Sequence, residues 1–102
     1  NIADLGGLLV AHDAFRTTRQ AREGRPIDGL TPDQRFFLAY AQSWRRSYRP
    51  EALKLQVNTD PHSPANFRVI GPLSNMDAFA RAFGCKDGDA MVNPVAARVR
   101  IW

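Results

Sequence analysis

Apolar residues recur at helical spacing in the first part of the chain. Leu5, Leu8 and Leu9 follow the i, i+3, i+4 pattern of an amphipathic helix, which predicts a first helix over residues 2 to about 22. The pair Gly6-Gly7 is costly inside a helix. We therefore expect these glycines to allow the close approach of another helix or a ligand.

The next predicted helix has a clear start. Thr31 suits an N-cap, Pro32 suits the first helical position, and Gln34 stands at the capping-box position. Glycines and a proline mark the preceding residues 24–29 as a loop. The helix should continue to about Arg46, with four aromatic side chains at helical spacing: Phe36, Phe37, Tyr40 and Trp44.

The second half of the chain predicts two further helices. One begins at Pro50 and ends before Asp60-Pro61. The other is capped by Ser74-Asn75 and ends at Gly84, a natural C-terminal cap. Between them, residues 67–73 are apolar but too few to distinguish a helix from a strand.

These patterns predict one mainly α domain with irregular connections. Its 102 residues, 44% hydrophobic and 24% charged, are typical of a single folded unit. Alternating apolar residues over 99–102 indicate that the last residues are tied to the fold. His12 reads as an ordinary helix residue. Four aromatic side chains are assigned to the core: Phe36, Phe37, Phe79 and Phe83.

The chain carries a formal net charge of +4, and arginine supplies most of the positive charge. A basic surface can bind nucleic acid or an acidic partner, or it can simply be solvated. No recognised nucleic-acid-binding motif accompanies this charge. We therefore expect no nucleic-acid partner, and a basic nucleic-acid binder stays as an alternative.

The single cysteine, Cys85, rules out an intrachain disulfide, and no Cys/His cluster has the spacing of zinc ligands. No run of residues is apolar and long enough to span a membrane. The sequence opens without a methionine or a basic-then-apolar leader, so we expect it to begin inside a longer chain.

Two prolines, Pro61 and Pro64, enclose a histidine in the middle of the chain. Each proline fixes its own φ and biases the preceding residue away from the helical region. The pattern predicts a rigid turn that presents His62, with Arg68 six positions later. An imidazole and a guanidinium placed in this way can bind a carbonyl oxygen or a carboxylate. The alternative is an ordinary surface turn.

Three stretches of the sequence form a more specific pattern. They are Asn1-Ile2-Ala3-Asp4-Leu5-Gly6-Gly7, residues 36–51 and residues 59–75, and the ending adds Asn93-Pro94 and Trp102. In order and spacing they resemble the C-terminal part of the neprilysin/endothelin-converting-enzyme family of zinc metallopeptidases. The resemblance covers nearly the whole chain.

The resemblance implies a zinc metalloendopeptidase that cuts oligopeptides beside a hydrophobic residue. In this family a zinc-binding glutamate directly precedes the position of Asn1, and the other ligands and the glutamate base lie on an upstream His-Glu-x-x-His helix. We therefore expect zinc as the cofactor but no metal ligand in this chain, and no activity from the segment alone. Residues 1–102 would be the C-terminal part of a thermolysin-like zincin catalytic lobe.

The family pattern also implies roles for individual residues. Asp4 matches an aspartate that hydrogen-bonds a zinc-bound histidine, although an acid near a helix N-terminus is favoured by the helix dipole alone. His62 matches the histidine that stabilises the oxyanion of the transition state. Arg68 matches the arginine that binds a backbone carbonyl of the substrate.

Two supporting residues complete the set. Asp60 is expected to orient Arg68 or His62, or else simply to cap the turn. Trp44 matches an aromatic residue that lines the pocket for the substrate side chain after the cut bond. An aromatic residue at helical spacing can equally be part of the core.

The resemblance further indicates the setting and the partners. Arg45-Arg46 and Val99 fall where vertebrate members have cysteines, which favours a disulfide-poor bacterial member. We expect a peptide substrate, the remainder of the same protease, and a secreted, periplasmic or membrane-anchored location. In isolation, apolar residues such as Leu8 would be exposed and would favour a homodimer. The alternative function is a stand-alone helical interaction module without catalytic activity.

Overall fold

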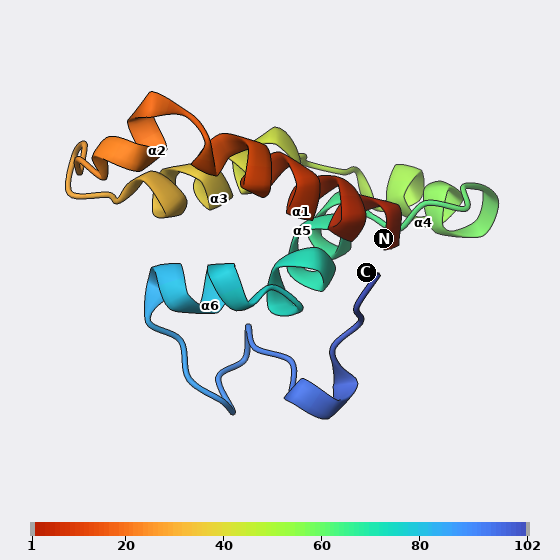
Figure 1. Cartoon of the computed structure of the whole chain (residues 1–102). Coiled ribbons are helices and arrows are strands. Elements are labelled where there is room, and N and C mark those ends of the chain that lie inside the picture. The colour runs from red at the N-terminus through yellow and green to blue at the C-terminus, as the bar shows by residue number, and fades with distance from the viewer. Residues whose placement is uncertain (1, 102) are drawn as a thin grey trace.

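The computed structural model describes residues 2–101, and Asn1 and Trp102 lie outside the described residues. Within this range the chain is mainly helical, as predicted, and its only β pairing is an isolated bridge between Ile27 and Leu30 (Figure 1). The helices in order are α1 Ile2–Arg16, α2 Arg19–Glu23, α3 Pro32–Ser43, α4 Pro50–Thr59, α5 Ala65–Ser74, α6 Asp77–Phe83 and the 3₁₀ helix η1 Val95–Ala97.

The single helix predicted over residues 2–22 is wrong, because α1 ends at Arg16 and α2 is a separate helix. Two threonine hydroxyls compete with the backbone at the break. Thr17 Oγ1 donates to the Ala14 carbonyl at 2.7 Å. Thr18 is the N-cap of α2, and its hydroxyl accepts a bond from the Ala21 N–H at 3.2 Å.

Helix α3 begins with the predicted capping box. The Thr31 hydroxyl accepts a bond from the Gln34 N–H at 3.3 Å, and Gln34 Oε1 accepts one from the Thr31 N–H at 2.9 Å. The predicted end at about Arg46 is wrong, because α3 ends at Ser43 with Trp44 as its C-cap. The Trp44 side chain therefore lies where α3 leads into the extended segment before α4.

Helix α4 has the predicted limits, and the ambiguous residues 67–73 are helical, as part of α5. The predicted cap of the last helix is wrong. Ser74 ends α5, Asn75 is the C-cap of α5, and α6 begins after Met76 without a side-chain cap. Gly84 ends α6 with φ +66°, as predicted, because glycine adopts this left-handed conformation without strain.

A compact core joins α1, α3, α5 and the start of α6. Its buried members are Leu5, Leu8, Phe37, Leu73 and Met76. The expectation that Leu8 would be exposed in isolation is therefore wrong: Leu8 is 4% exposed. The exposed apolar residues of α1 are instead Ile2 and Val10, with Gly7 between them, where an added Cβ would meet nothing within 4 Å.

The phenylalanines assigned to the core lie at different depths. Phe37 is 1% exposed and makes an edge contact with Phe79, the ring centroids 5.6 Å apart. Phe36 and Phe79 are partly buried against the core. The assignment of Phe83 to the core is wrong, because Phe83 is 37% exposed; its ring centroid lies 5.0 Å from that of Phe79.

The C-terminal segment is tied to the helices, as predicted for the residues that the structure describes. Asn75 Oδ1 accepts a bond from the Val99 N–H at 2.8 Å, and Ile101 packs against the core. Figure 1 shows this segment returning beside the N-terminal end of α1. No helix within residues 2–101 is long and apolar enough to cross a membrane.

Candidate functional site

Two residues 64 positions apart form the central contact of the site. Arg68 on α5 donates from Nε to Asp4 Oδ2 at 2.8 Å and from Nη2 to Asp4 Oδ1 at 2.5 Å. Asp4 is in the first turn of α1, and the α1–α5 packing brings the two side chains together. Only 11% of the Asp4 side chain and 22% of the Arg68 side chain are exposed. The fork of the guanidinium therefore has a fixed direction.

Trp44 covers the guanidinium of the same arginine. The Arg68 Cζ lies 4.1 Å from the centre of the Trp44 ring, close enough for a cation–π interaction. The Arg46 Cζ lies 5.7 Å from the same ring. Trp44 is thus not a simple core residue, since its ring helps to hold Arg68 in place.

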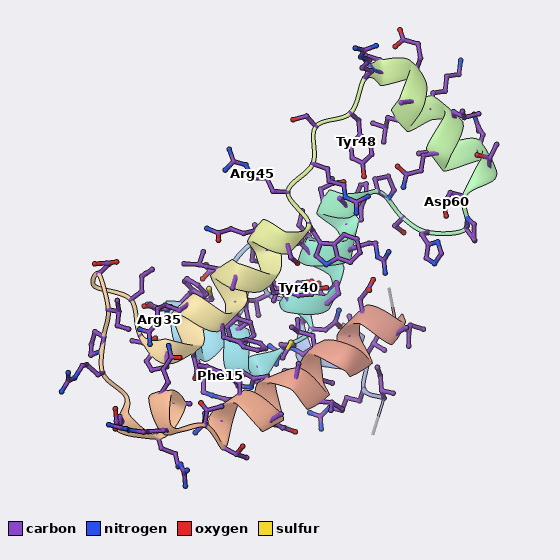
Figure 2. All side chains as sticks on the ribbon, turned by 90° about the horizontal axis from the view of Figure 1, so that it is seen from above. Phe15, Arg35, Tyr40, Arg45, Tyr48 and Asp60 are labelled. Atoms are coloured by element: carbon purple, nitrogen blue, oxygen red, sulfur yellow. The ribbon has the colours of Figure 1, made fainter. Side chains whose placement is uncertain are left out.

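A tyrosine replaces a helical hydrogen bond that α5 lacks. Pro72 lies inside α5 and has no N–H, so it cannot donate to the carbonyl of Arg68, four residues earlier. The Tyr40 hydroxyl on α3 donates to that carbonyl at 2.8 Å. Figure 2 shows Tyr40 between α3 and α5, the two helices that this bond connects. The backbone of Arg68 is therefore held as well as its side chain.

The charges of the cluster shift its ionisation. Hydrogen bonding and charge from Arg68 hold the pKa of Asp4 below its usual value, despite the opposing effect of burial. Burial and then the nearby Asp4 carboxylate raise the pKa of Tyr40. At neutral pH Asp4 is thus ionised and Tyr40 keeps its hydroxyl proton.

The turn after α4 holds a second pair, His62 and Asp60. One carboxylate oxygen, Asp60 Oδ1, lies 2.8 Å from the His62 backbone nitrogen and 2.8 Å from His62 Nδ1. The backbone N–H of His62, and then its side chain, lower the pKa of Asp60. Asp60 therefore both caps the turn and orients the imidazole. With Nδ1 directed at Asp60, the other ring nitrogen, Nε2, is the atom left to meet a ligand.

Within residues 2–101, the Asp60–His62 pair makes no hydrogen bond or ion pair with the Asp4–Arg68 pair. The His62 side chain is 65% exposed, whereas the Asp4–Arg68 pair is largely buried. Figure 2 shows Asp60 at the end of α4, away from Tyr40. The charge of Asp60 still contributes to raising the pKa of Arg68, after the larger contribution of Asp4. Asp60 is thus a direct partner of His62 and only a distant neighbour of Arg68.

An apolar cavity of about 600 Å³ adjoins Trp44, and we call it the Trp44 pocket. It lies between α3, α4 and α5 and the segment after α3. Its lining is mostly apolar, with Arg45 and Arg46 among the polar residues. Apolar members of the lining include Leu38, Trp44, Tyr48, Leu53, Val69 and Ile70. Its size and lining are those of a small-molecule or side-chain pocket.

No group of three or more His, Cys, Asp or Glu side chains that could hold a metal ion occurs within residues 2–101. Asp4 pairs with Arg68, and Asp60 pairs with the exposed His62. These carboxylates are therefore engaged in pairs and not gathered into a larger cluster within residues 2–101.

Sequence reasoning missed two buried polar contacts. His12, read as an ordinary helix residue, is 4% exposed, lies 3.1 Å from Asp33 Oδ1 and stacks on Phe37. Its spacing from Leu5 and Leu8 already placed it on the apolar stripe of α1. The role of Tyr40 was also missed, because residues 67–73 were left undecided between helix and strand. Only a helix there leaves the Arg68 carbonyl without the N–H of residue 72 and in need of another donor.

The family model named Peptidase family M13 matches residues 1–99. Among curated proteins, the chain is 45% identical over 106 residues to Neprilysin-3 of Drosophila melanogaster and 44% identical over 105 residues to human Endothelin-converting enzyme 1. Both alignments cover 100% of this chain. The chain spans only 13% of the length of each of these relatives.

A solved structure is similar to this chain in both fold and sequence. The zinc metalloprotease Zmp1 of Mycobacterium tuberculosis, in its open state, superposes with a TM-score of 0.84 and 40% sequence identity. The superposition covers 99% of this chain and 16% of that protein. The structure of Zmp1 in complex with an inhibitor gives the same TM-score and identity.

Proposed function

The chain belongs to peptidase family M13, and from that premise we propose that it is part of a zinc-dependent endopeptidase and supplies substrate-binding and transition-state-stabilising residues. The observation that carries this proposal is the Asp4–Arg68–Trp44 contact, which holds a guanidinium in one direction. We place the zinc ion on residues outside this chain. When bound, zinc would activate the attacking water and polarise the peptide carbonyl.

Arg68 binds a backbone carbonyl of the peptide substrate in this proposal. A guanidinium has five N–H donors, and the two contacts with Asp4 involve only Nε and one Nη2 donor. The Nη1 donors can therefore face a substrate oxygen. Asp4 and Trp44 hold the guanidinium in advance, so less conformational entropy is lost when the peptide binds.

His62 stabilises the negative charge that develops on the substrate carbonyl oxygen. Asp60 orients the imidazole through Nδ1, so that Nε2 faces away from the turn. An imidazolium in this orientation would present an N–H at Nε2. A single preorganised donor of this kind lowers the barrier by about 3 kcal/mol. The exposed position of His62 is compatible with contact to an incoming peptide.

Asp4 acts through Arg68 and through a zinc-bound histidine supplied by the rest of the protein. Each carboxylate oxygen can accept more than one hydrogen bond. The bonds to Arg68 are therefore compatible with the proposed contact with a histidine. That contact would fix the tautomer and orientation of the histidine.

The Trp44 pocket accepts the hydrophobic side chain that follows the cut bond. Its apolar lining supports this assignment, and Trp44 connects the pocket to Arg68. A peptide held by Arg68 would then have a side chain within reach of the pocket. The substrate class is thus an oligopeptide with a large apolar residue at this position.

The remainder of the same polypeptide is the partner that completes the site. On α1, Ile2 is 65% exposed and Val10 is 57% exposed, and Gly7 between them is open to a close neighbour. Such a face suits another helix better than water. A homodimer through this face, or a stand-alone interaction module, is the alternative that the test must exclude.

The test uses the complete polypeptide with zinc bound. His62→Ala should lower kcat by about 10²–10³-fold and change KM much less, because the donor acts mainly in the transition state. Arg68→Met should also raise KM for an apolar peptide. Arg49→Met, at an exposed arginine that caps α4, is the matched control and should change neither constant.

Two results would overturn the proposal. One is an unchanged kcat for His62→Ala in a folded enzyme. The other is an upstream coding sequence that lacks both a glutamate directly before Asn1 and a His-Glu-x-x-His segment, which would favour the interaction module. The isolated chain should neither bind zinc tightly nor cleave peptide. Zinc-dependent cleavage by the isolated chain would show that the ligands have been misplaced.

A further inference from the structure

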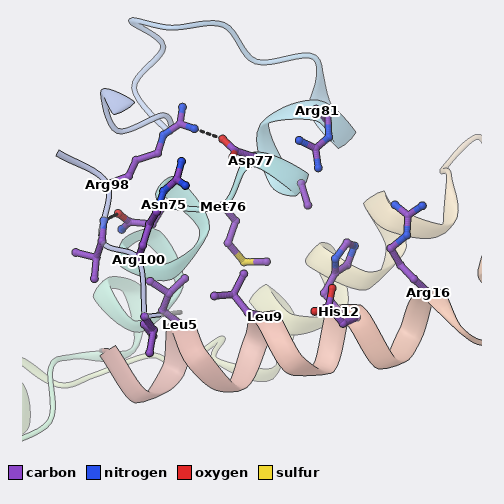
Figure 3. A pocket seen from close by; sticks show the side chains of 14 residues that line it. Leu5, Leu9, His12, Arg16, Asn75, Met76, Asp77, Arg81, Arg98 and Arg100 are labelled. Atoms are coloured by element: carbon purple, nitrogen blue, oxygen red, sulfur yellow. Dashed lines mark hydrogen bonds and ion pairs between the residues drawn. The ribbon is translucent and has the colours of Figure 1, made fainter. Parts of the chain in front are cut away.

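A second cavity, away from the Trp44 pocket, lies between α1, α6 and the C-terminal segment. It has a volume of about 330 Å³ and is lined by 14 residues. Four of the lining residues are arginines from three separate parts of the chain: Arg16, Arg81, Arg98 and Arg100. We call this cavity the basic pocket (Figure 3).

Two of the four guanidiniums are already engaged. Arg98 pairs with Asp77 and donates from Nε to the Asn93 carbonyl at 2.8 Å. Arg16 lies 3.7 Å from Asp33, which also contacts His12. These contacts offset the charges of Arg98 and Arg16, two of the four lining arginines.

The other two guanidiniums, of Arg81 and Arg100, form no ion pair within residues 2–101 and are exposed. Asp13 is the one acidic lining residue that has no ion pair in this range. The lining therefore carries two cations outside ion pairs and one such carboxylate, an excess of one positive charge that favours a ligand with a single negative charge. Figure 3 shows Arg81 and Arg100 on the same side of α1, above its apolar side chains.

The floor of the pocket is apolar. Leu5 and Met76 are buried core residues, and Leu9 packs against them. A ligand that matches both parts needs one anionic head and a small apolar body. A planar guanidinium binds a carboxylate through two parallel hydrogen bonds, which suits the head. The volume is that of a small-ligand site.

We propose that the basic pocket binds a small apolar monocarboxylate, whose head meets Arg81 and Arg100 and whose body lies on Leu5, Leu9 and Met76. The site is separate from the Asp4–Arg68 cluster. The proposal does not rest on peptidase activity, and its failure would leave the proposed function untouched.

Calorimetry on the complete polypeptide tests the proposal with three probes: hexanoate, acetate and hexanol. Hexanoate should bind saturably and more weakly as salt concentration rises. Acetate and hexanol should each bind at least tenfold more weakly, because acetate lacks the apolar body and hexanol lacks the carboxylate. Equal binding of hexanol and hexanoate, or of acetate and hexanoate, would overturn the proposal.

Variants locate the site. The double variant Arg81→Gln/Arg100→Gln should weaken hexanoate binding at least tenfold, whereas Arg22→Gln/Arg49→Gln removes the same charge elsewhere and should have no effect. All four arginines are exposed, so circular dichroism should report the same fold for both variants. Equal losses in the two variants would mean only a non-specific charge effect. Absence of hexanoate binding to the complete polypeptide would also refute the site, since another part of the protein would then fill it.

Discussion

Tyr40→Phe is the sharpest test of how Arg68 is held. The substitution removes one hydroxyl and leaves the ring in place, so the Arg68 carbonyl loses its 2.8 Å partner. Pro72 offers that carbonyl no N–H in exchange. A lost hydrogen bond costs about 1 kcal/mol, and an unsatisfied buried acceptor adds more. Because Tyr40 is only partly buried, we expect a total of about 1.5 kcal/mol.

The physical reason predicts a specific rescue. In a Pro72→Ala background, residue 72 regains an N–H that can donate to the Arg68 carbonyl, as in an ordinary helix. Tyr40→Phe should then cost less than about 0.5 kcal/mol. The coupling between the two substitutions in a double-mutant cycle should therefore be about 1 kcal/mol. The cavity left by the buried Pro72 ring appears in both arms of the cycle and cancels.

The assay is urea unfolding followed by circular dichroism, on the shortest polypeptide carrying this chain that unfolds cooperatively. Tyr48→Phe is the matched control, because the Tyr48 hydroxyl accepts a long 3.4 Å bond from the Ala65 N–H. It should cost less than Tyr40→Phe. Additive costs of Tyr40→Phe and Pro72→Ala, with no coupling, would refute the view that Tyr40 replaces the missing helical bond.

Three further outcomes follow from the cited contacts. The pKa of Asp4 in the folded chain lies below its ordinary 3.8. The ionised Asp4 therefore stabilises the fold fully above pH 3.8, and this stabilisation is lost as pH falls through the lower native pKa. The Asp4→Asn variant should lack this loss in an acid titration of the free energy of unfolding. The pKa of Tyr40 in the folded chain is raised above its ordinary 10.0. The protonated Tyr40 therefore contributes fully to stability below pH 10.0, and this contribution is lost as pH rises through the native pKa. In urea unfolding at alkaline pH, Tyr40→Phe should reduce this fall in the free energy of unfolding. Thr31→Ala should lower the free energy of unfolding by about 1 kcal/mol, measured by thermal melts, because it removes the hydroxyl of the α3 capping box; Thr59→Ala, in the last turn of α4, should cost less.

Local signals in the sequence predicted those helix ends that short-range chemistry determines. The capping box at Thr31, the start of α4 at Pro50 and the glycine end of α6 at Gly84 all depend on a few neighbouring residues. The break after Arg16 was missed because Thr17 and Thr18 can lie inside a helix as well as end one. The hydrogen bonds of these two hydroxyls favour ending the helix only slightly.

The contacts of the candidate site could not be predicted in the same way. The family resemblance identified Asp4, Trp44 and Arg68 as separate residues, but their mutual contact depends on how α1, α3 and α5 pack. Leu8 was misplaced for the same reason, because periodicity identifies an apolar face of a helix but not what covers it. Only the packing of all the helices shows whether an apolar face such as that of Leu8 is covered by the core of this chain or by another part of the protein.

Arg68 holds helices together and is also the proposed substrate-binding residue. Its substitution therefore cannot by itself separate the two roles. Its side chain bridges α1 and α5, and its carbonyl binds α3 through Tyr40. Arg68→Met therefore removes a substrate contact and an interhelical contact at once, so a change in KM alone would not separate them. Tyr40→Phe disturbs only the backbone of Arg68 and leaves the guanidinium on Asp4 and Trp44. If binding depends on the guanidinium, Tyr40→Phe should lower stability yet leave KM within about twofold of wild type, whereas Arg68→Met changes both.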